Sequence, residues 1–341
     1  MIFYPIFFAM EIVMSQFSVL NDILKDARTV FLSGHVNPDS DSMGSALAVA
    51  SMLRRMGKDV TVFRANNYPY NGMFLAGSGC AVTELPAEEP DLWFLVDCAT
   101  PKRSGDAFFA RMSASKAKKV ALDHHEGAAE NEGFYDFQFS DPDACAAAAV
   151  VWRWGREIGW RFDRDESEAL CFGVFGDTGG LRYANTNRET FAMVGELSEN
   201  FDYAEFCSQI YENESINRFR MLSEVIESMS VLADGQAIIF KTTLDQLEKY
   251  DLTPDVVDAL VDDVRSIGTV KLVFRIREVE RGCVWKFSIR SSGFRGNIDC
   301  IPIAKKYGGG GHRNAAGFTF NGSYEDAFAY AESTVHELFG R

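Results

Sequence analysis

The sequence predicts an α/β protein: an N-terminal domain with a parallel sheet and helices on both faces, a smaller α+β domain, and a cleft between them. Short apolar runs alternate with helical patterns over the first 200 residues, which is typical of parallel strands joined by crossover helices. Three strand-like runs and then two helices follow residue 231. The length of 341 residues exceeds one ordinary core and fits two domains.

The first domain is expected to hold four strands. Residues 29–34 form a β-branched and aromatic run, followed by a polar turn and by a helix over residues 42–56 that Gly57 ends. The other predicted strands are residues 58–63, 91–97 and 118–123. The other predicted helices are residues 144–158, 166–175 and 188–199.

No linker rich in proline or glycine separates the domains, so we place their boundary near residue 231. The expected divisions are an extension over residues 1–20, a first domain over 21–200, a helical connector over 201–230 and a second domain over 231–341. A helix is expected at residues 213–229 of the connector. The second domain is expected to contain strands at residues 236–243, 269–279 and 284–292 and helices at 299–307 and 324–338.

Neither membrane insertion nor secretion is expected. The apolar start of the chain is interrupted by Glu11, lacks a preceding basic residue and is shorter than the roughly 20 residues that span a bilayer. We interpret it as a short packed extension or an early start codon, with Met10 and Met14 as later starts. The seven scattered cysteines include no C-x-x-C pair, which argues against a disulfide framework or a structural zinc and favours the cytoplasm.

The net charge of −15 is unevenly distributed. From Arg265 to the end, the chain carries 12 basic and 7 acidic residues, whereas the first 264 residues carry 22 basic and 42 acidic ones. Our hypothesis is an acidic part that holds divalent cations and a basic part that holds phosphates. An acidic surface that only aids solubility remains the alternative.

Acidic and imidazole side chains gather where the predicted strands end. Four of the five histidines occur in three segments, HVNPDSD, LDHHEG and GGGGHRNAAG. Because the carboxyl ends of parallel strands meet at one edge of a sheet, we expect the first two segments and Asp97 to share a crevice. The residues expected there are His35, Asp39, Asp41, Asp97, Asp123, His124 and His125, with Asp177 as the remaining candidate.

This combination favours a metal site. Carboxylates and imidazoles, with one carboxylate placed to bridge, suit two Mn²⁺ or Mg²⁺ ions about 3.5–4 Å apart. Such ions can lower the pKa of a shared water and offset the charge of a phosphoryl group. A single histidine near an aspartate is more often a turn or a helix cap, but here four such clusters fall within one domain.

The glycine run of the second domain predicts a phosphate site. Gly309, Gly310 and Gly311 allow close approach of the backbone and present N–H groups to an anion, while His312 and Arg313 add directional donors. Their expected partners on a facing strand are Arg290, whose guanidinium can bind phosphate with two hydrogen bonds, and Ser291.

Taken in order, HVNPDSDSMGSALA, LVDCATPKR, ALDHHEG and FGDTGGLRYANT resemble the four motifs of the DHH phosphoesterase superfamily. GGGGHRNAAGF resembles the hallmark of its DHH-associated C-terminal domain. The resemblance covers roughly residues 25–335. Size and domain content are similar to the group of bacterial nano-RNases and pAp phosphatases, and to the cyclic-di-AMP and pApA phosphodiesterases of the same architecture.

The resemblance implies a role for each site residue. His35 and Asp39 would bind one manganese ion, Asp41, His124 and Asp177 the other, and Asp97 would bridge both. Asp123 would orient its neighbours, and His125 and Arg103 would face the scissile phosphate. Ser42 departs from the family, which commonly has alanine there, and we expect this small residue to be tolerated.

The implied function is a manganese-dependent phosphoesterase acting on very short oligonucleotides and on 3′-phosphoadenosine 5′-phosphate. The alternative is hydrolysis of cyclic-di-AMP or pApA, which these residues do not separate from the first activity. A nucleotide sensor without catalysis is disfavoured because no ligand is missing, and a pyrophosphatase or exopolyphosphatase because of the glycine motif. Oligomeric state stays open, with a homodimer as one alternative.

Overall fold

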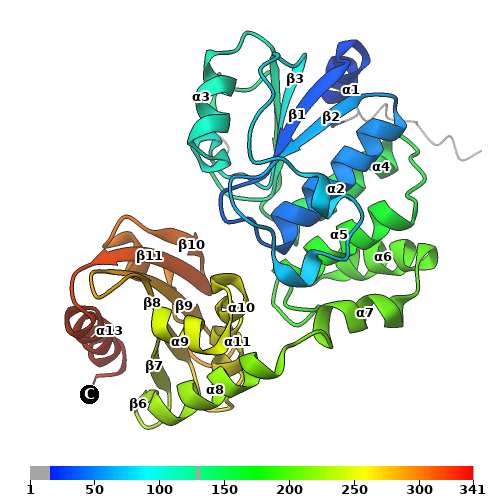
Figure 1. The fold of residues 1–341 in the computed structure, drawn as a ribbon. Helices are drawn as coiled ribbons and strands as arrows, with labels where there is room; N and C mark the ends of the chain where they lie inside the picture. Colours follow the sequence, from blue (N-terminus) through cyan, green and yellow to red (C-terminus); the bar gives the residue numbers. More distant parts are fainter. Residues whose placement is uncertain (1–15, 128–130, 341) are drawn as a thin grey trace, which may run out of the picture. The chain divides into compact units, whose positions relative to one another are not determined.

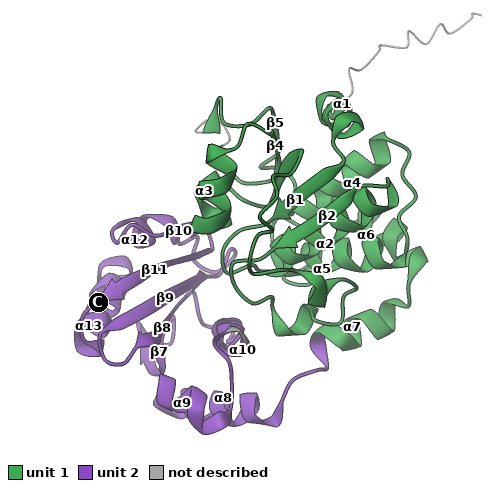
Figure 2. Ribbon diagram, turned by 45° about the horizontal axis from the view of Figure 1, so that its top comes forward, with its two compact units in different colours: residues 1–210 green, residues 211–341 purple. Residues whose placement is uncertain are grey.

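The computed structural model describes residues 16–127 and 131–340 and divides into two compact units, residues 1–210 and 211–341 (Figure 2). This division precedes the predicted boundary near residue 231 and falls within the predicted connector. Helix α7 (Tyr203–Tyr211) lies almost wholly in unit 1, and α8 (Ile216–Ser228) lies in unit 2. Most of the predicted N-terminal extension, residues 1–15, lies outside the described residues. From Phe17 onward the chain is packed, because Phe17 and Leu20 of α1 (Ser18–Asp26) are buried.

Unit 1 contains one parallel sheet of five strands in the order β2-β1-β3-β4-β5. Figure 1 labels β1, β2 and β3 of this sheet. Its strands are β1 (Thr29–Ser33), β2 (Asp59–Phe63), β3 (Leu92–Val96), β4 (Lys118–Asp123) and β5 (Phe137–Ser140). Four of them confirm the prediction. The fifth was not predicted because β5 is a short edge strand whose residues are only half buried.

Helices cover both faces of this sheet, which confirms the predicted fold class. One face packs on α3 (Asp106–Ala114), where Phe108 and Met112 contact Phe31 and Trp93. The other face belongs to the main core, to which α1, α2, α4, α5, α6 and α7 contribute. The bounds of the helices not yet given are α2 (Ser40–Arg55), α4 (Ala147–Glu157), α5 (Arg164–Asp177) and α6 (Arg188–Leu197).

Unit 2 contains a mixed sheet of six strands in the order β10-β11-β9-β8-β7-β6, in which only β7 and β8 are parallel neighbours. The strands are β6 (Ser230–Leu232), β7 (Ala237–Thr242), β8 (Leu272–Glu280), β9 (Val284–Ser291), β10 (Gly310–His312) and β11 (Ala315–Asn321). The glycine segment, for which we predicted a phosphate site, is partly a strand, and β10 forms a hairpin with β11.

Different helices cover the two faces of this sheet. Helices α12 (Ile301–Lys305) and α13 (Tyr324–Phe339) pack on one face, over residues such as Phe274, Phe287 and Phe318. Helices α8, α9 (Leu244–Tyr250), α10 (Pro254–Asp258) and α11 (Leu260–Arg265) pack around Ile238, Phe240 and Val273. Among the described residues, no helix is both long and apolar enough to cross a lipid bilayer.

Glu224 joins α8 to α9 and gives a testable contribution to stability. Its carboxylate accepts hydrogen bonds from Lys249 Nζ at 2.7 Å, Tyr250 Oη at 2.7 Å and Gln246 Nε2 at 3.0 Å. These bonds, that of Lys249 first, lower the pKa of Glu224 to about 2. Because the group is partly exposed, we expect Glu224→Gln to lower the free energy of unfolding at pH 7 by only about 0.5–1 kcal/mol.

The direction in which this stabilisation depends on pH follows from the lowered pKa of Glu224. Stabilisation by ionised Glu224 is present above the pKa of the unfolded chain, about 4.3, and is lost as the pH falls toward about 2. Urea unfolding of both proteins at pH 7 and pH 3 measures this, with Glu227→Gln on the same helix as the exposed control. An equal difference at both pH values would contradict the assignment.

Candidate functional site

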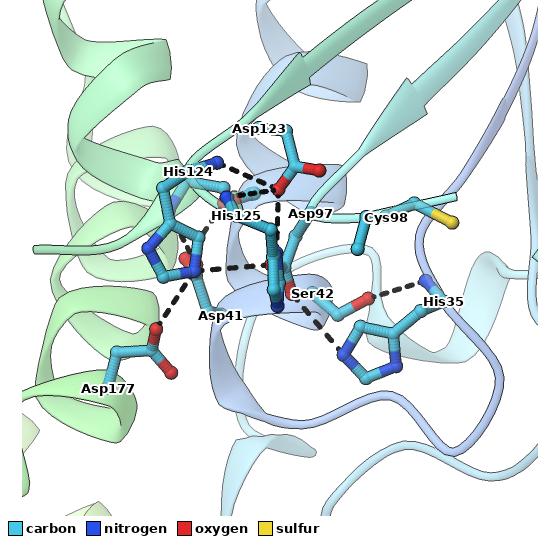
Figure 3. Close-up of polar contacts among 12 residues, drawn as sticks. His35, Asp41, Ser42, Asp97, Cys98, Asp123, His124, His125 and Asp177 are labelled. Atoms are coloured by element: carbon cyan, nitrogen blue, oxygen red, sulfur yellow. Dashed lines mark hydrogen bonds and ion pairs between the residues drawn. The ribbon is translucent and has the colours of Figure 1, made fainter. Parts of the chain in front are cut away.

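The carboxyl-terminal ends of β1, β3 and β4 bring the predicted ligands of unit 1 together (Figure 3). His35 follows β1, Asp97 follows β3, and Asp123 ends β4 before His124 and His125. Helix ends supply the rest of the predicted set, namely Asp39 and Asp41 at the start of α2 and Asp177 at the end of α5. Three groups within this set have ligand atoms within 4.8 Å of one another, namely His35–Asp39–Asp97, Asp41–His124–Asp177 and Asp97–His124–His125.

In the first group, His35 lies between two carboxylates. Its Nε2 is 3.5 Å from Asp39 Oδ2 and 3.3 Å from Asp97 Oδ2. Its Nδ1 lies 2.8 Å from the carbonyl oxygen of Val36, which favours a proton on Nδ1 and directs the Nε2 lone pair toward the carboxylates. Asp39 is also the N-cap of α2, because Oδ1 accepts hydrogen bonds from the N–H groups of Asp41 and Ser42. Its other oxygen therefore remains directed at His35.

In the second group, His124 Nε2 is 3.2 Å from Asp177 Oδ2 and 3.7 Å from Asp41 Oδ2. Asp41 is fully buried, and both of its oxygens accept hydrogen bonds. Ala147 N–H donates to Oδ2 at 2.6 Å, and Ala148 N–H and Ser45 Oγ donate to Oδ1 at 2.9 and 3.0 Å. The Asp41 side chain is consequently held in one orientation.

Asp97 connects the groups. It is 2% exposed, and its backbone adopts a left-handed conformation with φ of 50°, which is uncommon outside glycine. Oδ2 faces His35, while Oδ1 lies 3.6 Å from His124 Nε2 and 3.5 Å from His125 Nδ1. Burial alone would raise the pKa of Asp97, but the contacts with His124 and His35 hold it well below its ordinary value.

Asp123 orients the two histidines that follow it. Its Oδ1 accepts hydrogen bonds from the N–H groups of His124 and His125 and lies 2.8 Å from His125 Nδ1. The side chain of Arg103 is exposed, and its carbonyl oxygen accepts a hydrogen bond from the N–H of Val36, beside His35. The ALDHHEG segment and the loop after β3 thus lie at the same site.

Charges in the cluster alter proton affinities. Burial first, and then the charge of Asp97, raise the pKa of Asp41 to about 7. Burial and the charges of Asp41 and Asp39 also raise the pKa of Asp177. Burial lowers the pKa of His124, but its contacts with Asp97, Asp41 and Asp177 outweigh this effect and raise it to about 11. Protons and cations therefore compete for the same atoms.

The site fits divalent cations. Asp97 Oδ1 is buried and has no hydrogen-bond partner, and such an atom is costly unless a ligand satisfies it. Imidazole nitrogens and carboxylate oxygens together are donors for Mn²⁺, Zn²⁺ and related ions, and less so for Ca²⁺. Asp97 belongs to the ligand groups on both sides of the site, so it is placed as a bridging carboxylate would be.

Sequence reasoning missed the residues that hold these ligands. Ser42 Oγ accepts a hydrogen bond from His35 N–H at 3.0 Å, so the residue expected to be merely tolerated fixes the backbone of a candidate ligand. Ser45 and the first N–H groups of α4 hold Asp41 in the same way. The spacing of Ser45 four residues after Asp41 on a helix is the one signal that could have shown its contact.

In unit 2, a pocket of about 200 Å³ lies on the sheet face opposite α12 and α13. Lys286, Ser288 and Arg290 alternate along β9 and line it, beside Arg275 of β8. Arg275 is only 1% exposed and donates to Asp258 Oδ1 at 2.5 Å and to Ser288 Oγ at 2.9 Å. The other lining residues are Asp258, Phe287, Gly310, Ala315, Ala316 and Gly317. Three cations and one carboxylate make this pocket suitable for an anion.

The predicted substrate residues of unit 2 are placed differently from one another. Arg290 and Gly310 line the pocket, whereas Ser291 is buried and donates to the carbonyl oxygen of Ile298. Arg313 donates to Asn297 Oδ1. Gly309 and Gly311 serve strand packing, because a Cβ atom there would lie 2.2 Å from the Gly317 oxygen and 2.4 Å from the Ala315 oxygen, respectively. His312 is in β10, and its side chain lies outside the described part of the chain.

Family comparisons agree with the two units. The model of the DHH family, N-terminal domain, matches residues 29–174, and that of the DHHA1 domain matches residues 235–339.

Individual proteins extend the similarity over most of the chain. The bifunctional oligoribonuclease and PAP phosphatase NrnA of Bacillus subtilis is 28% identical over 297 residues, which is 85% of this chain and 88% of that protein. An exopolyphosphatase-related protein from Bacteroides fragilis has a similar structure, with a TM-score of 0.85, 25% identity and coverage of 95% and 96% of the two chains. RecJ of Thermus thermophilus in complex with Mn²⁺ shares the fold, with a TM-score of 0.54, 14% identity and coverage of 96% and 54%.

Proposed function

We propose that this chain, a member of the DHH family of phosphoesterases, hydrolyses very short oligonucleotides and 3′-phosphoadenosine 5′-phosphate with the help of two divalent cations, and that it prefers Mn²⁺. The similarity to the NrnA protein of Bacillus subtilis over 85% of the chain supports the substrate class. The observation that carries the proposal is the convergence of Asp97 with His35 and His124 at one sheet edge.

The ligands would divide into two sets that share Asp97. His35 and Asp39 would hold one cation, and Asp41, His124 and Asp177 the other. When bound, such a pair of ions lowers the pKa of a water between them and offsets the negative charge of the phosphoryl group.

The other residues of the site would act on the substrate directly or through a neighbour. Asp123 holds the His125 ring through Nδ1, so Nε2 would be the nitrogen that faces a phosphate oxygen of the substrate. His125 would donate a hydrogen bond there, and the exposed guanidinium of Arg103 would add charge. The water itself is the nucleophile, so the reaction needs no serine or cysteine.

Unit 2 would recognise the phosphate of the nucleotide beyond the cleaved bond. We assign this contact to Arg290, Lys286 and the Gly310 backbone, since these line a pocket rich in cationic side chains. We still propose that the other predicted substrate-binding residues border this phosphate contact, namely Ser291, Gly309, Gly311, His312 and Arg313. The seven cysteines are free, and we place the reaction in a reducing cytoplasm.

A panel of small nucleotides tests this function. The purified chain is assayed with Mn²⁺ and with Mg²⁺ on RNA dinucleotides, pAp, pApA, pGpG, cyclic-di-AMP and inorganic polyphosphate. We expect turnover of the dinucleotides and pAp, with Mn²⁺ more effective than Mg²⁺. Highest activity on cyclic-di-AMP or pApA would support the alternative activity, and activity on polyphosphate alone would refute a nucleotide phosphoesterase.

Arg290→Gln tests the pocket of unit 2. Removing one charge-assisted contact to phosphate is worth about 1.5–3 kcal/mol, so we expect KM for dinucleotides to rise about tenfold or more while kcat changes little. Lys305→Gln is the matched control, because Lys305 is exposed on α12, which packs on the other face of the sheet. Equal KM values for the two variants would show that the pocket does not bind substrate.

A further inference from the structure

One short segment contacts Asp41 and His124 directly through its main chain and is joined to Asp177 by the side chain of Asn185. It comprises residues 144–148, where α4 begins. Ala147 N–H donates to Asp41 Oδ2 at 2.6 Å, and Ala148 N–H donates to Asp41 Oδ1 at 2.9 Å. The N-cap residue of α4, Ala146, offers no capping side chain, so Asp41 caps this helix from a different part of the chain.

The same segment faces His124. The carbonyl oxygen of Ala144 lies 3.4 Å from His124 Nδ1, a long contact that favours a proton on that nitrogen. The Nε2 lone pair is then directed toward Asp41 and Asp177, where a cation would lie.

Asn185 joins the segment to the third ligand. Its side-chain nitrogen Nδ2 donates to the carbonyl oxygen of Cys145 at 2.9 Å and to that of Asp177 at 3.1 Å. Asp177 ends α5, and two left-handed glycines, Gly179 and Gly180, follow it. The Asn185 amide therefore sets the end of α5 against the start of α4.

We propose that the main chain of residues 144–148 is a template that sets the relative positions of Asp41, His124 and Asp177 for one of the two cations, with Asn185 as a positioning residue. The inference rests on the proposed metal-dependent function. It also explains why the segment reads Ala-Cys-Ala-Ala-Ala, since all five side chains are buried and a Cβ added at Gly173 would already lie 2.9 Å from Ala148 Cβ. Larger side chains would move the template away from its ligands.

Ala147→Pro removes one donor of the template. Proline is accepted at the first position of a helix, and Ala146 has the extended conformation that a following proline requires, with φ of −167° and ψ of 159°. The variant loses the N–H that Asp41 Oδ2 accepts, and its ring displaces that oxygen. Arg188→Pro is the matched control, because Arg188 is the first residue of α6 and the Asn187 side chain accepts hydrogen bonds from the N–H groups of Glu189 and Thr190 and from Thr190 Oγ1, not from the N–H of Arg188.

Asn185→Leu keeps the approximate size of the side chain and removes both amide bonds. Asn185 is exposed, so this variant is expected to fold even if Ala147→Pro does not. Asn200→Leu is its control, because Asn200 makes one hydrogen bond of similar length, 2.9 Å to Ser167 Oγ, without contact to a candidate ligand.

The measurement is Mn²⁺ binding to the full chain after chelator treatment, by calorimetry and by electron paramagnetic resonance, with thermal melting of the metal-free proteins. We expect each template variant to weaken the binding of one of the two Mn²⁺ ions about tenfold, which is equivalent to about 1.4 kcal/mol. The affinity for the other Mn²⁺ ion and the melting temperature of the metal-free protein should stay near their wild-type values. The control variants should bind both ions as wild type does. In the template variants, the electron paramagnetic resonance signal of two spin-coupled Mn²⁺ ions should appear only at a higher Mn²⁺ concentration than in wild type.

The outcomes separate two kinds of failure. If wild type binds two Mn²⁺ and Asn185→Leu binds both as tightly as wild type, the template is refuted while the proposed function stands. If both affinities fall together with the melting temperature, the segment is only structural. If wild type binds no Mn²⁺, the proposed function itself fails.

Discussion

Asp97→Asn is expected to lower turnover of dinucleotides with Mn²⁺ by a factor on the order of 10³ or more, equivalent to at least about 4 kcal/mol. Asp97 belongs to the His35–Asp39–Asp97 group and also lies 3.6 Å from His124 Nε2, a member of the Asp41–His124–Asp177 group. The amide keeps the shape of the side chain but removes its charge, so one substitution would weaken both of the proposed cation sites. Asp97→Ala, which also removes the donor atoms, should abolish turnover. Steady-state rates at saturating Mn²⁺ measure the effect.

Asp106→Asn is the control for this loss. Asp106 is an exposed aspartate in the first turn of α3. Its replacement removes the same charge from the same unit and should leave the rate near that of wild type. The metal-free Asp97→Asn protein should melt below the wild-type temperature, because the contacts with His124 and His35 that hold the pKa of Asp97 low also stabilise the folded state, so rates are compared at a temperature where both proteins are folded. Turnover of Asp97→Asn within tenfold of wild type would contradict the two-cation site.

Gly173→Ala is expected to destabilise unit 1 by about 3 kcal/mol, near the upper end for an overpacked core. A Cβ atom at Gly173 of α5 would lie 2.8 Å from Asp41 Oδ1 and 2.9 Å from Ala148 Cβ. Neither neighbour can easily move, because Asp41 is bonded to the first N–H groups of α4. The gain in helix propensity from glycine to alanine, about 1 kcal/mol, is too small to compensate.

Thermal unfolding measures this prediction. For a unit of this size, about 3 kcal/mol corresponds to a fall in melting temperature of roughly 6–12 °C. Gly195→Ala in α6 is the matched control, because its Cβ would meet no atom within 4 Å, and it should leave stability unchanged or slightly raised. A Gly173→Ala protein that melts like wild type would show that α2, α4 and α5 adjust to the added methyl group.

The positions of the candidate ligands could be predicted because they follow a regular rule. Asp97 and His124 stand directly after short apolar runs, and parallel strands place such positions at one edge of the sheet. The position of Asp177 does not follow this rule, because Asp177 ends a helix rather than a strand. Its distance from His124 depends on how α5 packs.

Other features depend on tertiary contacts that leave little trace in a sequence. The hydrogen bonds from Ala147 and Ala148 to Asp41 come from main-chain atoms, and alanine carries no sign of them. Four successive glycines carry no side-chain pattern that predicts a strand, yet pairing with β11 makes Gly310 and Gly311 part of one. Adjacent residues of a strand point to opposite faces, so Arg290 and Ser291 could not both reach one pocket once β9 had formed.

If the proposed two-cation site holds, the order of the candidate ligands along the chain would determine when the protein can take up metal during translation. The set begins at His35 and ends at Asp177, the last residue of α5. A ribosome-bound chain that lacks α5 would contain the complete His35–Asp39–Asp97 group and only two members of the Asp41–His124–Asp177 group. Loading of the second cation would therefore wait until Asp177 has left the exit tunnel, when the whole parallel sheet has already been synthesised.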